Sequence, residues 1–402
     1  PEVFDDTPEG YQVFKNFLEG IAGLEADATF RDKQLRGLVR FKRKQIAAAT
    51  GDRHVIAFVS GGVDSSVAMA LAVEVIPPAR LHAFFIDNGF MRDEDELVIE
   101  TLQKAGIEVQ RVDAVNDFEQ ATISLDGRTL GPLVDVTDPE TKRKIIGKTF
   151  IDVQNRLVAS LNLNEALLLQ GTNAADRIES GHSKADSVTS TIKTHHNQVK
   201  EVRQLKDRGL LLEPIDDLFK DEVRELGREL GLPDELVERQ PFPGPGLAIR
   251  IIAAEGSRSL PEPHKDQSAV SDYIANHTPH AKVHLLPIRS VGVGGDERSH
   301  LSVAAVEHGG LKADQLSKLG ADLPAHFREI INRVIYALGP APLNKHSITA
   351  TRLAADVRSQ LRHADRIVFE AMRLGGLLGT IKQFPVVLLP LSFDKAGKRS
   401  IV

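Results

Sequence analysis

The sequence predicts an α/β protein whose parallel sheet is covered by helices on both faces. Short apolar runs rich in β-formers alternate with stretches of helical periodicity, and a glycine turn joins the first run to the helix after it. Strands buried on both faces of a sheet read as continuous apolar runs of this kind. Ligands of such sheets bind at the carboxyl ends of the strands, so the residues after each strand are the candidates for function.

The elements follow in order along the chain. The expected strands cover residues 54–59, 81–86, 108–113 and 166–170, and the expected helices cover 9–18, 31–53, 65–75, 93–105 and 145–161. The helix at 31–53 is amphipathic and basic, which a solvated helix face explains better than a nucleic-acid patch. Residues 114–141 and 176–190 are polar and turn-rich, and we expect surface loops or mobile lids there.

The second half of the chain starts at a connector of unusual composition. Residues 241–246 read Pro-Phe-Pro-Gly-Pro-Gly, which excludes a helix or a central strand and indicates a domain boundary. Beyond it a weak repeat relates residues 285–290 to 388–392, each followed by a glycine turn and an Arg-Ser pair. If the duplication is real, the second copy stops just after its opening strand, which indicates an incomplete chain. The start at Pro1 in place of Met indicates the same for the other end.

Composition excludes several classes of site. The chain has 402 residues, enough for two or three domains, and a net charge of -6. It has no Cys, which excludes disulfides, Cys-ligated zinc, iron–sulfur clusters and a thiol nucleophile within it. Trp is absent and aromatics make up 5%, which argues against a base-stacking surface. The chain does not open with a signal peptide, and its apolar stretches are too short to span a bilayer. The location that we expect is the cytoplasm.

A glycine turn between the first strand and the next helix is the strongest functional signal. Residues 60–66 read Ser-Gly-Gly-Val-Asp-Ser-Ser. Glycines allow the backbone to approach a ligand, and the N–H groups of the turn and of the helix start favour an anion. The alternative is a plain glycine turn with a helix cap. The loop lacks the Lys of a Walker A motif and the spacing of a dinucleotide-binding one.

The loop resembles that of the ATP pyrophosphatase (PP-loop) family, Ser-Gly-Gly-x-Asp-Ser. Further matches in order along nearly the whole chain resemble the glutamine-hydrolysing GMP synthetase family in its longer form. They stand at residues 60–66, 86–92, 142–147, 170–172 with 176–180, 192–197, 219–224 and 241–250. The resemblance implies an adenine nucleotide α-hydrolase-like PP-loop domain, followed by a duplicated α+β dimerisation domain. It also implies domain limits at 1–24, 25–240, 241–345 and 346–402.

The resemblance assigns roles to residues, beside what their own chemistry indicates. Ser60, Gly61, Gly62, Val63, Asp64, Ser65 and Ser66 would hold ATP and pyrophosphate; Asp87 and Gly171 would meet its ribose or adenine; Lys193, His195, His196, Lys220 and Asp221 would act as lid or catalytic residues; Arg143, Asp296 and Gln383 would bind xanthosine monophosphate (XMP). Asp64 would organise Mg²⁺, and the spacing of Asp176 and Glu179 allows both carboxylates to face one Mg²⁺. Without the resemblance, Asp87 reads equally well as a turn residue, and Lys220 as an exposed helix-start lysine.

The implied reaction is the ATP-dependent amination of XMP, with ATP, XMP and ammonia as partners and a homodimer as the assembly. Glu2 would be the third member of a glutaminase triad whose Cys and His lie upstream, so this chain would use free ammonia. Gln240 stands where the family usually has His, and residues 173–175 also depart from its pattern. The alternatives are an NAD synthetase-like or argininosuccinate synthase-like ligase, a tRNA-modifying PP-loop enzyme and a non-catalytic scaffold. We expect neither nucleic acid nor a membrane as a partner.

Overall fold

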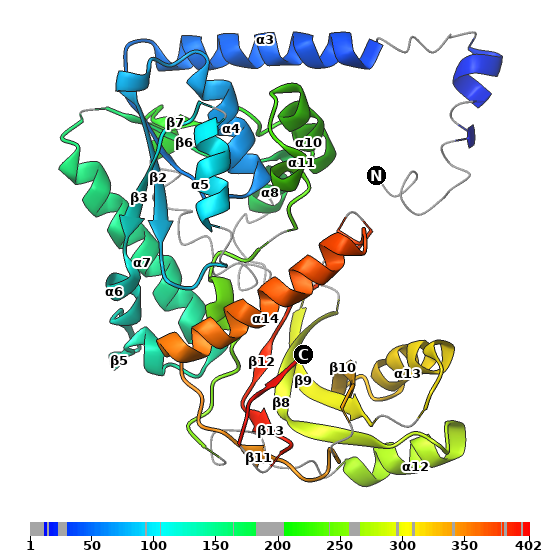
Figure 1. Cartoon of the computed structure of the whole chain (residues 1–402). Coiled ribbons are helices and arrows are strands. Elements are labelled where there is room, and N and C mark those ends of the chain that lie inside the picture. The colour runs from blue at the N-terminus through cyan, green and yellow to red at the C-terminus, as the bar shows by residue number, and fades with distance from the viewer. Residues whose placement is uncertain are drawn as a thin grey trace.

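The structure is a computed structural model. It describes residues 12–13, 16–22, 30–92, 95–104, 106–163, 165–181, 205–240, 242–256, 266–294, 297–307, 310–339, 342–378, 380–381, 384–394 and 397–402. Two layered regions share these residues, with helix α14 (Ala355–Leu374) crossing between them (Figure 1). Within the described residues, no helix is both long and apolar enough to span a bilayer.

The first region is built on a five-stranded parallel sheet in the order β3-β2-β1-β6-β7. Its strands are β1 (Val55–Phe58), β2 (Leu81–Asp87), β3 (Val109–Asp113), β6 (Leu167–Leu169) and β7 (Leu211–Leu212). The predicted parallel sheet and four of its strands are confirmed; β7, two residues long, was missed. Strand β1 lies between β2 and β6, so the chain leaves it toward both edges, and this reversal point is where such sheets bind ligands.

Helices cover one face of this sheet as the alternating pattern predicted. They are α3 (Phe30–Thr50), α4 (Val63–Val73), α5 (Asp95–Lys104), α10 (Lys220–Glu229) and α11 (Asp234–Val237). Their apolar sides form one core with the strands, in which Ile46, Leu71 and Leu226 are fully buried.

Some of the basic side chains of α3 have acidic partners within the chain. Arg31 pairs with Glu225 of α10, and Arg36 approaches Glu229 at 3.7 Å. Lys42 is buried and lies 2.5 Å from Asp217. Part of the positive charge of this helix is therefore balanced by acidic side chains of the same chain.

The opposite face is covered by α6 (Val115–Glu119), α7 (Pro139–Ser160) and α14. Asp138 caps α7 by accepting from the N–H of Thr141 at 2.7 Å, so the helix begins six residues before the predicted start. The expected plain loop at 114–141 was wrong: it also holds the hairpin of β4 (Ile123–Leu125) and β5 (Arg128–Leu130) and the turn η3 (Leu133–Asp135). The loop expected from residue 176 was also wrong up to residue 181, because α8 (Ala174–Gly181) is helical.

The second region contains two helix-and-strand units. The first has α12 (Gln267–His277), β8 (Val283–Gly294), β9 (Glu297–Val306), α13 (Ala313–His326) and β10 (Ile331–Tyr336), in a sheet ordered β10-β9-β8. The second has α14, β12 (Leu388–Leu389), β13 (Leu391–Ser392) and β14 (Ser400–Ile401), while β11 (Ser347–Ile348) pairs with β13.

The two units share an order of elements. In each, a helix precedes the Leu-Leu-Pro segment, and the strand that contains its two leucines pairs antiparallel with a later strand: β8 with β9, and β12 with β14. Leu286 and Ile288 of the first unit pack in one core with Leu389 and Leu391 of the second. The common order and the shared core support the duplication, while the domain limits stay a prediction.

A buried ionic cluster ties α14 to the first region. The carboxylate of Asp365 lies 2.8 Å from Arg92 Nε and 3.2 Å from Arg250 Nη1. Both guanidinium groups stack over the ring of Phe242, at 4.6 and 4.8 Å from its centre. The cluster joins the loop after β2, the Pro-rich connector and α14, so the expected boundary at 241–246 is a packed junction.

A buried lysine holds the far end of the connector. Lys142 of α7 is 1% exposed, and its Nζ donates to the carbonyls of Ala248 and Ile251 at 3.2 and 2.9 Å. Burial of its ammonium group lowers the pKa of Lys142 to about 7. Lys142 therefore holds the chain after the connector against α7, although burial disfavours the charged form of the lysine.

The lowered pKa of Lys142 predicts how stability depends on pH. Between pH 7 and 10.5 the unfolded chain holds a proton on this lysine that the folded chain has released. The unfolding free energy should therefore rise with pH in this window, by up to about 1.4 kcal/mol per pH unit from this group. Denaturant titrations at pH 7 and 9 should show a flatter dependence in Lys142→Met than in wild type. Lys148→Met, an exposed change on the same helix, should keep the wild-type slope; equal slopes for Lys142→Met and wild type would contradict the assignment.

Candidate active site

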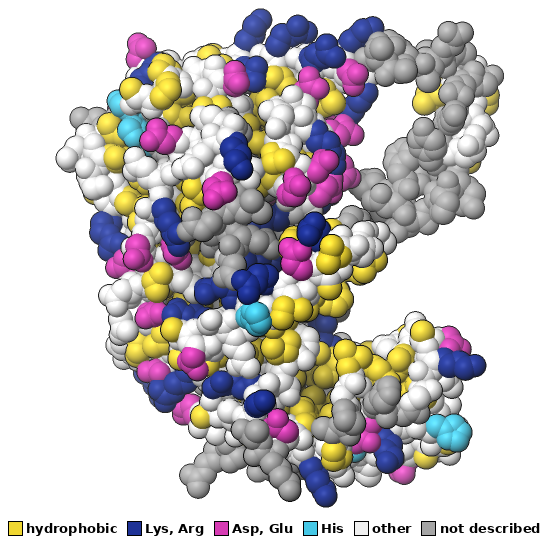
Figure 2. Space-filling view, in the orientation of Figure 1, with side chains coloured by type: hydrophobic (Ala, Val, Ile, Leu, Met, Phe, Trp, Pro, Cys, Tyr) yellow, Lys and Arg dark blue, Asp and Glu magenta, His cyan; other side chains and the backbone are white. Residues whose placement is uncertain are grey.

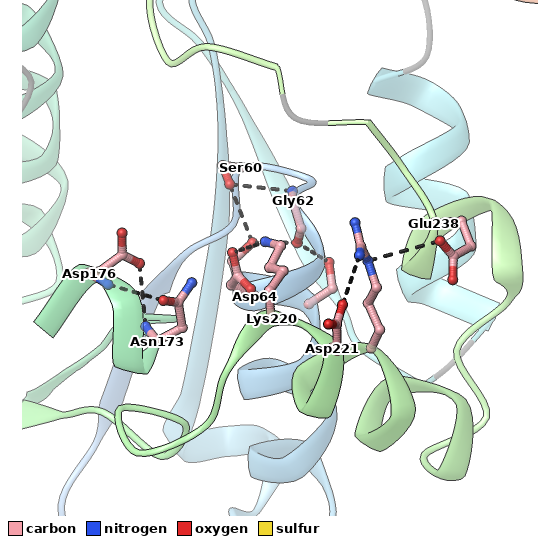
Figure 3. Close-up of polar contacts among 11 residues, drawn as sticks. Ser60, Gly62, Asp64, Asn173, Asp176, Lys220, Asp221 and Glu238 are labelled. Atoms are coloured by element: carbon pink, nitrogen blue, oxygen red, sulfur yellow. Dashed lines mark hydrogen bonds and ion pairs between the residues drawn. The ribbon is translucent and has the colours of Figure 1, made fainter. Parts of the chain in front are cut away.

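The glycine turn after β1 has the geometry predicted for an anion-binding loop. Gly61 has φ +74°, a left-handed conformation that only glycine adopts without strain. The hydroxyls of Ser65 and Ser66 donate to the carbonyl of Gly62 at 3.0 and 2.9 Å. Ser60 Oγ accepts from the N–H of Gly62 at 3.4 Å (Figure 3). Because α4 starts at Val63, the N–H groups of its first turn have no partner within the helix and favour an anion.

This loop forms one end of a cavity of about 510 Å³. Three kinds of group line it: the loop residues 60–64, apolar side chains from the sheet and α7, and charged or polar side chains. The apolar group includes Phe85, Ile86, Ile146 and Phe150, and the charged or polar group includes Asp64, Arg143, Lys220, Arg239 and Gln240. An apolar wall beside a few convergent charges is typical of small-molecule sites, and the volume is within their usual range.

Asp64 and Lys220 meet at the mouth of the loop. Lys220, the first residue of α10, places its Nζ 2.5 Å from Asp64 Oδ2 (Figure 3). The other oxygen, Asp64 Oδ1, is buried and has no hydrogen-bond partner among the described residues. A buried carboxylate oxygen without a donor is costly, and a hard cation would satisfy it. The chemistry of Asp64 therefore fits Mg²⁺.

Gly171 lies directly against the loop. A Cβ at this position would lie 2.6 Å from both the carbonyl carbon of Asp64 and the amide nitrogen of Ser65. The chain after β6 thus packs against the backbone of residues 60–66, which we call the phosphate loop. The structure brings Gly171 to the predicted site, at a position where no side chain fits.

Arg143 enters the cavity from α7, on the wall formed by that helix. Its side chain is 11% exposed and forms an ion pair with Glu140 one turn earlier. Arg143 and the phosphate loop therefore line the same cavity, which is necessary if they belong to one site.

Asp176 has a structural partner of its own. Its Oδ2 accepts from the N–H of Asn173 at 3.4 Å, and its N–H donates to Asn173 Oδ1 at 3.1 Å, at the start of α8 (Figure 3). Glu179 lies on α8, with its side chain outside the described residues. The described residues contain no group of three or more acidic or His side chains suited to a metal. A magnesium pair of Asp176 and Glu179 stays a prediction.

Asp87 and Asp221 do not line the cavity. Asp87 has the contacts of a turn residue, which was the alternative interpretation from the sequence. Its Oδ1 accepts from the N–H of Gly89 at 2.9 Å, and its Oδ2 pairs with Arg111 at 2.6 Å. Asp221 is 85% exposed and pairs with Arg224 at 3.3 Å. Six predicted site residues lie outside the described residues: Glu2, Lys193, His195, His196, Asp296 and Gln383.

Sequence reasoning missed Arg239. Its Nη1 donates to the carbonyl of Gly61 at 2.9 Å, and the residue lines the cavity. The available signal was its place two residues before the Pro-rich connector, a block singled out only as a boundary.

The chain is similar in sequence to one family model and to several curated proteins. A family model described as NAD synthase matches residues 35–143. The glutamine-hydrolyzing GMP synthase of Dictyostelium discoideum is 37% identical, covering 100% of this chain and 61% of the relative. The probable GMP synthase of Caenorhabditis elegans is 35% identical, covering 98% and 60%. That of Schizosaccharomyces pombe is 42% identical, covering 76% and 55%. This chain thus spans about three fifths of the length of the curated relatives it matches.

The close approach at Gly171 predicts the effect of one added methyl group. Gly171→Ala should push the backbone at residues 64–65 out of place, because overpacking against backbone atoms costs about 1–3 kcal/mol. Binding of a non-hydrolysable ATP analogue, measured by calorimetry, should weaken by roughly tenfold or more. Gly320→Ala is the matched control, since a Cβ there meets no atom within 4 Å. Wild-type affinity in Gly171→Ala would show that the loop does not depend on this contact.

Proposed function

Since this chain belongs to the GMP synthase family, we propose that it catalyses the ATP-dependent amination of XMP to GMP. In the first step the 2-oxygen of the xanthine base attacks the α-phosphorus of ATP, and pyrophosphate leaves. In the second step ammonia displaces AMP from the adenylated base. The observation that carries the proposal is the single cavity in which the phosphate loop, Lys220 and Arg143 meet.

The phosphate loop would hold the β- and γ-phosphates of ATP. Its helix start supplies N–H donors, and the hydroxyls of Ser60, Ser65 and Ser66 stand beside them. Lys220 is positioned to neutralise charge that develops on the leaving pyrophosphate. Pyrophosphate held in this way would leave the α-phosphorus open to the acceptor.

Asp64 would hold Mg²⁺ through its buried Oδ1. When bound, the ion would screen the phosphate charges. Lys220 keeps Asp64 Oδ2 occupied, which orients the other oxygen.

The acceptor nucleotide would bind at the α7 side of the cavity. Arg143 suits a 5′-phosphate, because a guanidinium group binds oxyanions through two parallel donors. Further roles in the proposal rest on the family resemblance: Asp87 and Gly171 for ATP, Asp176 and Glu179 for Mg²⁺, Lys193, His195, His196 and Asp221 for the lid, and Asp296 and Gln383 for XMP. The homodimer and the cytoplasmic location rest on the same resemblance.

Ammonia would reach this chain from outside. Hydrolysis of glutamine by a covalent route needs a nucleophilic thiol, and the chain has no Cys. We therefore expect ammonium, and not glutamine, to support amination by this chain alone. Glu2 would be the remaining triad residue of a glutaminase unit.

A second candidate is an NAD synthetase-like ligase, favoured by the family model that matches residues 35–143. That match covers the phosphate loop and Arg143 and stops before the connector at 241–246. The two candidates share the adenylation step and differ in the acceptor.

The proposed activity predicts which substrates release pyrophosphate. The chain with ATP, Mg²⁺, XMP and ammonium should release one pyrophosphate per GMP formed, and glutamine should not replace ammonium. The acceptor of an NAD synthetase, tested in place of XMP, should give only background. Pyrophosphate release that is independent of XMP, or that follows the other acceptor, would refute the proposal.

The position of Arg143 predicts a change specific to the acceptor. Arg143→Met should raise the KM for XMP about tenfold or more, because a bidentate hydrogen bond to a phosphate is lost, and should change the KM for ATP little. Lys144→Met is the control, since the next residue of α7 does not line the cavity. Steady-state pyrophosphate release at varied XMP and at varied ATP separates the two constants. An unchanged KM for XMP in Arg143→Met would exclude this arginine as the phosphate ligand.

A further inference from the structure

Arg239 holds one peptide group of the phosphate loop. Its Nη1 donates to the carbonyl of Gly61 at 2.9 Å. In a trans peptide the N–H of the next residue points the opposite way, and the N–H of Gly62 indeed faces Ser60 Oγ. Since glycines turn readily, a flipped peptide would present a carbonyl dipole to the phosphates. The hydrogen bond from Arg239 opposes that flip.

The loop has room for Arg239 only because residue 61 is glycine. A Cβ at this position would lie 2.6 Å from Arg239 Nη1 and 3.1 Å from Val98 Cγ1. The positive φ at position 61 and the close approach of the guanidinium group therefore both require glycine there.

Gln240, the next residue, contacts a segment that comes later in the chain, whereas Arg239 contacts an earlier one. Its Nε2 donates to the carbonyl of Ile381 at 2.5 Å. Ile381 belongs to the second region, two residues before Gln383, which is proposed to contact XMP. Adjacent residues thus reach the ATP loop on one side and the segment beside the acceptor on the other.

The rest of the connector continues this wall of the cavity. Phe242, Pro243 and Pro245 line the cavity, and Lys142 anchors the chain again at Ala248 and Ile251. Hydrogen bonds hold both ends of this wall, and its prolines restrict the backbone between them. A displacement of one end should therefore move the other end.

We propose that Arg239 and Gln240 form a link that holds the phosphate loop in register with the segment at Ile381, with Arg239 as a positioning residue for ATP. The link rests on the proposed function, because it couples ATP to the acceptor nucleotide of that reaction. Through it, XMP bound at the α7 side favours the loop conformation that binds ATP. The affinity for ATP should therefore be higher in the presence of XMP.

The test measures affinity instead of turnover. The full chain is titrated by calorimetry with a non-hydrolysable ATP analogue, with and without saturating XMP. Arg239→Met should weaken analogue binding about tenfold or more, since a hydrogen bond from a charged donor is lost, and Arg239→Lys should restore part of it. Gln240→Met keeps an uncharged side chain of similar length but removes the donor. It should leave the affinity without XMP within about twofold of wild type and reduce the gain that XMP gives.

The double variant and a control sharpen the test. Arg239→Met with Gln240→Met should lose no more of the XMP effect than Arg239→Met alone, because both residues belong to one link. Arg228→Ala removes an exposed arginine that pairs with Asp234 and Glu238, and it should match wild type. Thermal unfolding of each variant confirms that it is folded.

Three results would overturn the link. They are an affinity of Arg239→Met within twofold of wild type, an undiminished XMP effect in Gln240→Met, and no effect of XMP on analogue affinity in wild type. Failure of the proposed function has a separate signature, since wild type would then release no XMP-dependent pyrophosphate. Analogue binding without XMP still reports the role of Arg239 in that case.

Discussion

The architecture depends on the close approach of two backbones at the point where the sheet reverses. Gly171, after β6, lies so near Asp64 and Ser65 that even a methyl group has no space. That approach requires β1 and β6 to be neighbours, and their pairing from Val55 with Leu167 sets the register. The phosphate loop is thus held by the sheet below, by Gly171 behind and by Arg239 at its first glycine. A short, glycine-rich loop becomes rigid through its surroundings, not through its own sequence.

Buried polar groups perform a second task by joining the two regions. Asp365 on α14 binds Arg92 and Arg250, and Lys142 binds two carbonyls beyond the connector. Such groups are expensive to bury, and breaking one partner leaves the others unsatisfied. Their presence at one junction indicates that the relative positions of α14, the connector and the loop after β2 are closely fixed. Phe242, over which both guanidinium groups stack, also lines the cavity, so these buried charges lie beside the candidate site.

The sequence predicted the sheet because each of its longer strands is a distinct apolar run, as at β2 (Leu81–Asp87). It missed β7 because two residues show no period, and it placed loops over α6 and α8 because short helices with polar faces resemble loops. The phosphate loop was predictable since all its residues are adjacent. Arg239 and Lys142 were not, because their partners lie 178 and about 106 residues away in the chain. Only folding brings those partners together.

Charge balance gives the strongest physical reason to connect the cavity with phosphates and a cation. Arg143, Lys220 and Arg239 bring three positive charges to its lining, and Asp64 brings a carboxylate into the same space. A carboxylate beside a phosphate site would repel the ligand if both stood alone. Lys220 compensates Asp64 at Oδ2 only, and Oδ1 stays buried without a donor among the described residues. A divalent cation held by Oδ1 would remove the conflict, because its charge would compensate both the carboxylate and the phosphates.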